Sequence, residues 1–343
     1  RGAFPRAAEL LWARGEDGVR STAPSRPRTA PLPESLSLRY GLTPAFDAYV
    51  AIDWSATSVR NTGADSVWWA LAAWDRGVLR LESDNCPTRT ALATWLHATL
   101  TGPLRDRRTL VGFDFPLGYP HGFATALGHA GSASDAWRFT WRRIAAAVRD
   151  SDANANNRFE AAAALNAAVS GGFGPFYGRP ARVPDAIART LPARRIGHFE
   201  FPLRTLRGPS LASRRLADER ARTSSSPWFV YCGGNSVGGQ ALVGLPRLLA
   251  LRDALPDARV WPFETGARCP ARDEARVVLA EIYPSLFHAR DRASPEVHDK
   301  LQVLAAARGF AALDANGELS RLFEAPPDDP AVLYEEGWVL GVR

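Results

Sequence analysis

Four acidic residues lie where the sequence pattern predicts a strand end or the start of a helix. Asp53 ends the apolar run AYVAID, Asp114 follows TLVGF, and Glu281 ends VVLAE. Such runs, rich in β-branched and aromatic residues, are typical of strands. Asp299 lies in the first turn of the helix predicted from SPEVHDKLQVLAAARG. Carboxylate oxygens are the ligands that hard cations prefer, so the pattern predicts that these four residues bind Mg²⁺ or Mn²⁺.

The chemistry of such a cluster follows from its charge. Four carboxylates held close together repel one another, and without a cation some of them bind protons at raised pKa values. Two cations about 3.5–4 Å apart would relieve the repulsion, activate a water molecule and stabilise a leaving oxygen. We expect Asp53 to bridge the cations, and Glu281 to bind the second cation or to orient the water. Hydrolysis of a phosphodiester is the leading expectation, and the alternative for each aspartate is a turn that closes a strand.

Four polar residues are candidates for substrate binding: Ser55, Arg158, Ser236 and Gln240. Arg158 starts the predicted helix RFEAAAALNAAV, and its guanidinium suits a phosphate, although a surface helix with an internal ion pair is the alternative. Ser236 and Gln240 lie in GGNSVGGQ, where glycines before a helix allow backbone N–H groups to approach a phosphate. This segment lacks the Gly-Lys-Ser or Gly-Lys-Thr of a P-loop, so a tight structural turn is an equal alternative.

The elements that must position these residues fall into two core halves. In the first half, strands are predicted at 48–54, 66–74, 77–83 and 109–115, with a helix at 88–100. The turn Asp75-Arg76-Gly77 joins the second strand to the third. In the second half, strands are predicted in WFVYC, ARVWPFET and ARVVLAEIYPSL, followed by a helix that Ser294 caps and Gly309 ends. This order predicts an α/β fold with a mixed sheet flanked by helices.

A long section between the two halves, residues 118–226, shows no alternation of strands and helices. It contains helical patterns in SDAWRFTWRRIAAAVRD and RFEAAAALNAAV, then a loop rich in glycine and aromatic residues. We expect a large helical and loop-rich insert after the fourth strand, lying over the sheet. Residues 1–44 are rich in Pro, Ser and Arg, which predicts a disordered extension before a single domain at 45–343.

Seven motifs in this order resemble those of the uncharacterised prokaryotic proteins grouped as domain of unknown function 429: AIDWSA, VGFDFPLGYP, NSVGGQALVGLP, WPFET, AEIYPSL, VHDKLQVLAAA and EEGWVLGV. Those proteins are regarded as predicted nucleases with a ribonuclease-H-like fold. The resemblance covers roughly residues 48–343. It implies that Asp53 and Asp114 are the carboxylates of the first and fourth strands, and that Glu281 and Asp299 complete the cluster. The large insert after Asp114 departs from the compact ribonuclease H plan.

Positive charge is concentrated in the insert. The chain has a net charge of +6, and Lys300 is its only lysine, so 41 of its 42 basic residues are arginines. Residues 189–222 carry nine of these arginines against three acidic residues. Two interpretations stay open: a solvated basic surface, or a surface that binds nucleic acid or a nucleotide.

Several classes of protein are disfavoured by composition. The sequence has no apolar run near the ~20 residues of a membrane span and no signal-peptide pattern at residues 1–18, so we expect a cytoplasmic protein without membrane contact. Three widely spaced cysteines disfavour a zinc cluster or a disulfide framework. Two alternatives to the hydrolase remain. One is a non-catalytic accessory or binding protein linked to cofactor biosynthesis, and the other is an ATP-using transferase on the same core fold.

Overall fold

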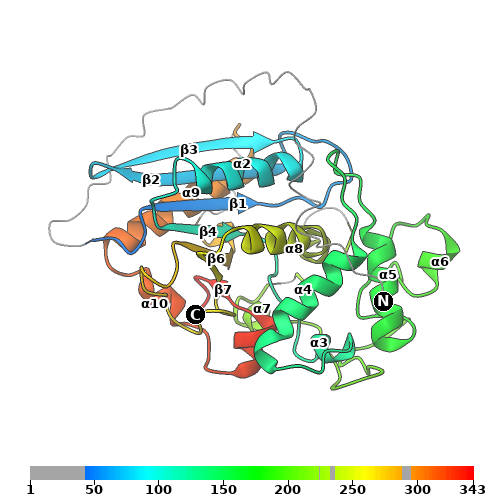
Figure 1. Cartoon of the computed structure of the whole chain (residues 1–343). Helices are drawn as coiled ribbons and strands as arrows, with labels where there is room; N and C mark the ends of the chain where they lie inside the picture. The colour runs from blue at the N-terminus through cyan, green and yellow to red at the C-terminus, as the bar shows by residue number, and fades with distance from the viewer. Residues whose placement is uncertain (1–42, 224, 232–235, 288–294) are drawn as a thin grey trace, which may run out of the picture.

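The structure is a computed structural model that describes residues 43–223, 225–231, 236–287 and 295–343. It confirms an α/β fold: a mixed sheet of seven strands is flanked by helices (Figure 1). Most of the predicted N-terminal extension, residues 1–42, lies outside the described residues, as do residues 232–235 of the glycine-rich segment and the predicted cap Ser294.

The first half of the core follows the sequence pattern closely. Three strands form an antiparallel meander, β1 (Ala48–Asp53), β2 (Val67–Asp75) and β3 (Val78–Cys86). Arg76 and Gly77 both have positive φ angles, as a two-residue hairpin turn of the primed type requires. Helix α2 (Arg89–Thr101) begins after Thr88, whose side chain accepts a hydrogen bond from the Ala91 N–H. Strand β4 (Thr109–Phe113) then returns parallel to β1.

The second half adds the remaining strands to the far side of β4. Strand β6 (Val277–Ile282) pairs with β4 in parallel, and β5 (Ala258–Val260) and β7 (Val339–Leu340) both pair with β6 in parallel. The order along the sheet is β3-β2-β1-β4-β6-β5. Because β1, β4 and β6 are neighbours and run in the same direction, their carboxyl ends meet at one edge of the sheet.

Helices cover both faces of the sheet (Figure 1). One face packs against α9 (His298–Ala315), which contacts β1, β2 and β3. The opposite face packs against α2 and α8 (Val237–Ala254). Side chains alternate between the two faces along each strand: Val50 and Ile52 join the core under α2 and α8, whereas Tyr49 and Ala51 join the core under α9.

The described part of the insert is made of helices and loops, as predicted. Its elements are α3 (Phe123–Ala126), a 3₁₀ turn (Ala133–Asp135), α4 (Ala136–Ala147), α5 (Arg158–Ser170), α6 (Asp185–Ala188) and α7 (Leu216–Arg220). The aromatic rings of Tyr119, Phe123, Phe176 and Trp228 pack together with centroids 4.8–5.9 Å apart and are almost fully buried. The insert therefore has an aromatic core of its own that continues the core of the sheet.

Three predictions for the second half were wrong. Residues 228–231 of WFVYC form turn and loop rather than a strand, with a bridge from Phe229 to Tyr177. The strand predicted in ARVWPFET ends at Val260, and residues 261–265 form a turn. Gly309 does not end α9, which continues to Ala315. A Cβ atom at Gly309 would lie 2.3 Å from the Phe287 ring, so this glycine allows close packing within the helix.

A 3₁₀ turn (Pro284–Leu286) follows β6. After α9, the chain continues through α10 (Ser320–Phe323) and a π-helical turn (Val332–Glu336) to β7. The π-helical turn contacts the start of the insert. Glu335 accepts hydrogen bonds from the N–H groups of Gly122 and Ala124, and Glu336 accepts from the N–H groups of His121 and Leu216.

Candidate functional site

Asp53 and Asp114 lie side by side at the carboxyl edge of the sheet. Asp53 ends β1 and Asp114 directly follows β4, the parallel neighbour of β1. Both side chains lie on the α9 face, because each is one residue beyond a residue of the opposite core, Ile52 and Phe113 respectively. The two carboxyl groups are hydrogen-bonded to each other. The N–H of Trp54 donates to Asp114 Oδ1 at 2.6 Å, which fixes the orientation of that carboxyl group.

Asp299 brings a third carboxyl group from α9. It lies in the first turn of the helix, and its charge raises the pKa of both Asp53 and Asp114. Asp299 Oδ2 accepts a hydrogen bond from the N–H of Asp65 at 3.0 Å. The structure therefore brings together Asp53, Asp114 and Asp299, the residues that the sequence pattern places at two strand ends and one helix start.

Asp65 is a member of this group that the sequence analysis missed. Its charge also raises the pKa of Asp53, and its carbonyl oxygen accepts a hydrogen bond from Ser55 Oγ at 2.9 Å. Asp65 has a φ angle of 56°, in the left-handed region that aspartate tolerates better than most residues. Because it lies in an irregular loop between β1 and β2, no strand or helix pattern marks it in the sequence.

The electrostatics of the aspartate pair follow from its surroundings. Burial raises the pKa of Asp53 well above its usual range, and the charges of Asp114 and Asp299 raise it further. Burial also raises the pKa of Asp114, to about 7, although the hydrogen bonds from Asp53 and from the Trp54 N–H lower it. Both pKa values are therefore raised, as expected for buried like charges in close contact. Both residues keep part of their surface exposed to solvent.

Glu281 does not join these aspartates. In the parallel register Glu281 lies opposite Phe113, one residue before Asp114, so its side chain lies on the opposite face of the sheet. There it is fully buried and bound to Arg215, with Nη1 to Oε2 and Nη2 to Oε1 distances of 2.7 Å each. Glu281 Oε2 also accepts from the N–H of Leu117 at 3.0 Å. The expectation that Glu281 completes the acidic cluster is corrected by this geometry.

Arg215 belongs to the arginine-rich segment, yet it is completely buried. It contacts Asp218 as well as Glu281, and Tyr283 donates to Asp218 at 3.0 Å. Burial lowers the pKa of Arg215, and the charges of Asp218 and Glu281 more than reverse this effect. This buried network connects α7 of the insert to β6 of the core, so part of the basic segment is structural.

Three of the four residues proposed for substrate binding lie in the loop after β1 or contact it. Ser55 is bonded within the loop, Gln240 donates to the carbonyl oxygen of Trp54, and Arg158 donates to Ser58 Oγ at 2.9 Å. Arg158 is buried and also donates to the carbonyl oxygen of Val230, so it is not the surface residue of the alternative interpretation. Ser236, at the start of α8, has a buried hydroxyl without a hydrogen-bond partner among the described residues.

The side chains as they stand do not form a ready-made metal centre. Within the described residues, no group of three or more His, Cys, Asp or Glu side chains is arranged so that it could hold a metal ion. In this arrangement Asp299 accepts a hydrogen bond from the Asp65 N–H, and Asp114 accepts one from the Trp54 N–H.

Comparisons with protein-family models, with curated proteins and with solved structures found no match to this chain. Across the described part of the chain, no helix has the length and apolar character needed to cross a membrane. The resemblance to domain of unknown function 429 stays a hypothesis carried by the sequence motifs, and the function must be argued from the aspartates themselves.

Proposed function

We propose that this protein is a metal-dependent hydrolase of phosphodiester bonds that uses Asp53, Asp114 and Asp299 as its carboxylates. The observation that carries the proposal is the position of Asp53 and Asp114 on one face of the sheet, at the carboxyl ends of the parallel neighbours β1 and β4, where each raises the need for a neutralising partner. Structural aspartates at strand ends have no reason to meet as a pair, because two carboxyl groups in contact destabilise each other when both are ionised.

The donor set fits a hard divalent cation. All the groups involved are carboxyl oxygens, and Asp299 and Asp65 add negative charge to the same place. Mg²⁺ or Mn²⁺ bound by Asp53 and Asp114, with Asp299 beside them, would supply charge stabilisation and a more acidic bound water. The partial exposure of Asp53 and Asp114 leaves solvent access to these carboxyl groups.

The surrounding chain holds these carboxylates in place. The backbone N–H of Trp54 orients Asp114, and the Asp65 N–H orients Asp299. Ser55 fixes the loop that carries Asp65 by donating to the carbonyl oxygen of that residue. Ser55 therefore acts as a positioning residue for the site, in addition to its proposed contact with substrate.

The proposed substrate is a nucleic acid or a nucleotide. Between residues 182 and 222, seven arginines have exposed side chains and offer positive charge to phosphates: Arg182, Arg189, Arg194, Arg204, Arg207, Arg220 and Arg222. Guanidinium groups bind phosphate oxygens through paired N–H donors. Because these arginine side chains are exposed, they can contact phosphate without breaking contacts inside the protein.

The experiment compares wild type with Asp53→Asn and with the control Asp106→Asn, which changes an exposed aspartate whose ion pair in the described part of the chain is with exposed Arg105. Thermal unfolding is measured in EDTA and in excess Mn²⁺, and cleavage of a fluorescent single-stranded oligonucleotide is followed in parallel. We expect Mn²⁺ to raise the Tm of wild type and of Asp106→Asn but not of Asp53→Asn. In EDTA, Asp53→Asn should be as stable as wild type or more stable, because it removes a buried like-charge contact.

Different results point to the other candidate functions. A wild-type Tm that ignores Mn²⁺, with a destabilised Asp53→Asn variant, would contradict the metal site and favour the accessory-protein alternative. Consumption of ATP without oligonucleotide cleavage, lost in Asp53→Asn, would favour the transferase alternative.

A further inference from the structure

Strand β3 is one edge of the sheet, since it pairs with β2 and with no other strand of the described chain (Figure 1). It is nine residues long, and the side chains of Val78, Arg80 and Asp84 are exposed. A long open edge offers unpaired backbone N–H and C=O groups to another strand, so natural proteins usually shorten such an edge or cover it. The edge at β3 is therefore a candidate surface for a partner.

The register of the β2–β3 hairpin determines which backbone groups of β3 point outward. In a two-residue hairpin the residues that flank the turn, Asp75 and Val78, exchange backbone hydrogen bonds, and every second residue of β3 after Val78 does the same with β2. Leu79, Leu81 and Ser83 therefore point their N–H and C=O groups away from β2. These groups have no hydrogen-bond partner among the described residues.

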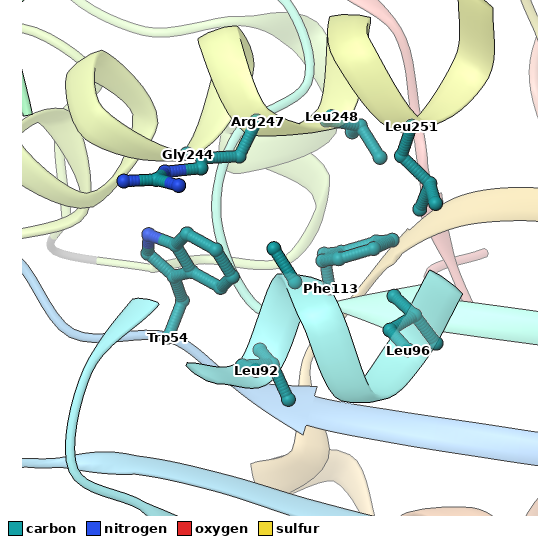
Figure 2. Close-up of a pocket in the computed structure, with 9 residues that line it drawn as sticks. Trp54, Leu92, Leu96, Phe113, Gly244, Arg247, Leu248 and Leu251 are labelled. Atoms are coloured by element: carbon teal, nitrogen blue, oxygen red, sulfur yellow. The ribbon is translucent and has the colours of Figure 1, made fainter. Parts of the chain in front are cut away.

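Helices on both faces hold this edge in place. Both α2 and α9 contact β3. Figure 2 shows α2 packed against α8 through Leu92, Leu96 and Leu248, and the space among these side chains has room for about one water molecule. A strand that is held between packed layers loses little conformational freedom when it pairs with another strand, which favours association.

The side chains of the edge are charged on one face and apolar on the other. Arg80 and Glu82 lie on the face of α2, whereas Leu79 and Leu81 are only half-buried against the core under α9. Arg80 contacts Asp75 at 3.7 Å, with side chains that are 67% and 50% exposed, so this ion pair is weak. Arg80 and Glu82 are thus available to charged groups of a partner strand.

A second copy of the chain fits this edge. Two copies related by a two-fold axis pair the same strand antiparallel, and backbone hydrogen bonding requires an outward-pointing residue on the axis. With Leu81 on the axis, Arg80 of each copy lies directly opposite Glu82 of the other. This is a non-hydrogen-bonded pair, in which the side chains lie closest. Leu79 then exchanges backbone hydrogen bonds with Ser83 of the other copy.

The neighbouring registers fit less well. With Ser83 on the axis, Glu82 lies opposite Asp84 of the other copy, which places like charges together twice. The Asn85 N–H, which that register needs, already donates to Asp84 Oδ1 at 2.8 Å. With Leu79, the second residue of β3, on the axis, only about three strand residues of each copy overlap. Charge and hydrogen bonding therefore favour the register centred on Leu81.

We propose that the protein forms a symmetric dimer in which the β3 strands of two copies pair antiparallel around Leu81. About six backbone hydrogen bonds join the two sheets into one, and the two Arg80–Glu82 ion pairs fix the register. The half-buried leucines of the two copies cover each other on the α9 face. Because a single edge makes a small interface, the dimer is weak and depends on concentration. The proposal does not depend on the proposed hydrolase, since it uses none of the aspartates of that site.

The test measures the mass of the full chain by sedimentation equilibrium over a wide range of protein concentration. We expect wild type to pass from the 37.3 kDa monomer to twice that mass as concentration rises. Arg80→Glu and Glu82→Arg each turn two attractive pairs into two repulsive ones, so each variant should dimerise about tenfold more weakly or worse. An equal mixture of the two variants restores both ion pairs in the mixed dimer, which should form with wild-type affinity.

Two further variants complete the test. Arg142→Glu makes the same charge change at an exposed arginine of α4, far from β3 in Figure 1, and should leave dimerisation unchanged. Ser83→Pro removes an outward-pointing donor and keeps the hydrogen bonds to β2, because proline is tolerated where an edge N–H faces solvent. It should abolish the dimer without lowering the Tm of the monomer by more than a few degrees. Should Ser83→Pro fail to fold, the charge variants and their mixture decide alone.

Three results would overturn the proposal. A wild type that stays monomeric at every concentration leaves the edge to a different partner. A dimer that either charge variant forms as tightly as wild type uses another surface. A mixture of Arg80→Glu and Glu82→Arg that stays as weak as the separate variants contradicts the register centred on Leu81.

Discussion

At the scale of single residues, Asp114 and Glu281 show that a shift of one residue along a strand places an acidic side chain on the opposite face of the sheet and so changes its role. Both are acidic and both lie at the carboxyl ends of central strands, β4 and β6. Asp114 lies beside Asp53 on the α9 face, where burial raises its pKa, whereas Glu281 is neutralised by Arg215 on the opposite face. The same chemical group therefore serves a candidate reactive site in one case and a structural ion pair in the other.

The raised pKa of Asp114 predicts how stability depends on pH. Its pKa is about 7 in the folded protein and near 4 in an unfolded chain, so the folded state binds the proton more tightly. The stabilisation is fully present below about pH 4 and is lost as pH rises through about 7. We expect the Tm in EDTA to fall from pH 5 to pH 8, and to fall less steeply in Asp114→Asn. Equal slopes in wild type and Asp114→Asn would contradict the raised pKa.

A second prediction separates Glu281 from the aspartates. Glu281→Gln removes one partner of a completely buried ion pair, which typically costs about 3–5 kcal/mol of unfolding free energy. We expect urea unfolding to show a loss of this size, with the rise in Tm on adding Mn²⁺ kept. Asp53→Asn should show the reverse pattern, with stability kept and the response to Mn²⁺ lost. A Glu281→Gln variant that is as stable as wild type but whose Tm does not respond to Mn²⁺ would contradict this separation and indicate that Glu281 binds the metal.

At the scale of elements, the C-terminal π-helical turn holds the beginning of the insert against the core. Gly118 lies directly beneath it, and a Cβ atom there would lie 2.2 Å from the carbonyl oxygen of Glu335 and 2.3 Å from that of Glu336. Neither carbonyl group can move without breaking the turn whose side chains bind the N–H groups of residues 121–124. The contact between these distant segments thus depends on the absence of one side chain.

Gly118→Ala is therefore expected to destabilise the protein, by about 1–3 kcal/mol as for other overpacked sites. Gly172→Ala is the matched control, because a Cβ atom there meets no atom within 4 Å and the backbone conformation suits alanine. Its stability should stay within about 0.5 kcal/mol of wild type. Chemical denaturation measures both variants, and equal stabilities would mean that the terminal turn moves away freely.

At the scale of the whole molecule, the net charge of +6 is divided between structural and exposed arginines. Arg89, Arg158 and Arg215 are completely or almost completely buried and hold loops and helices together. The exposed arginines of the insert are the part of the charge that can meet a polyanion. Deleting the whole basic segment would remove Arg215 as well, so substitutions must spare it.

The quadruple variant Arg204→Gln, Arg207→Gln, Arg220→Gln and Arg222→Gln tests the proposed nucleic-acid surface. We expect wild type to bind a single-stranded oligonucleotide with an affinity that falls steeply with salt, and the variant to bind more weakly with a shallower dependence on salt. The control replaces Arg80 and Arg105, exposed arginines of the core, by glutamine. Fluorescence anisotropy between 50 and 200 mM salt measures all three, a range over which such contacts respond strongly. Equal salt slopes in all three proteins would contradict a role for the insert.

Much of the fold can be predicted from sequence because its elements have local causes. Apolar runs rich in β-branched and aromatic residues mark β1, β2 and β4, the Arg76-Gly77 turn marks the hairpin, and Thr88 marks the start of α2. The strand ends also point to Asp53 and Asp114, and the helix start points to Asp299. Local patterns failed at WFVYC and at Gly309, where packing against the insert and against Phe287 decided the structure.

By itself, the sequence determined the elements of the core, the residues at their ends and the excess of arginine. Only the tertiary structure decided which acids meet, because the face on which a side chain lies depends on strand register, and a shift of one residue reverses it. It likewise decided that Arg215 is buried against Glu281 and that Asp65 joins the aspartates from a loop. Each of these contacts joins residues that are close in space but far apart in sequence, and no local pattern of residues encodes such a distance.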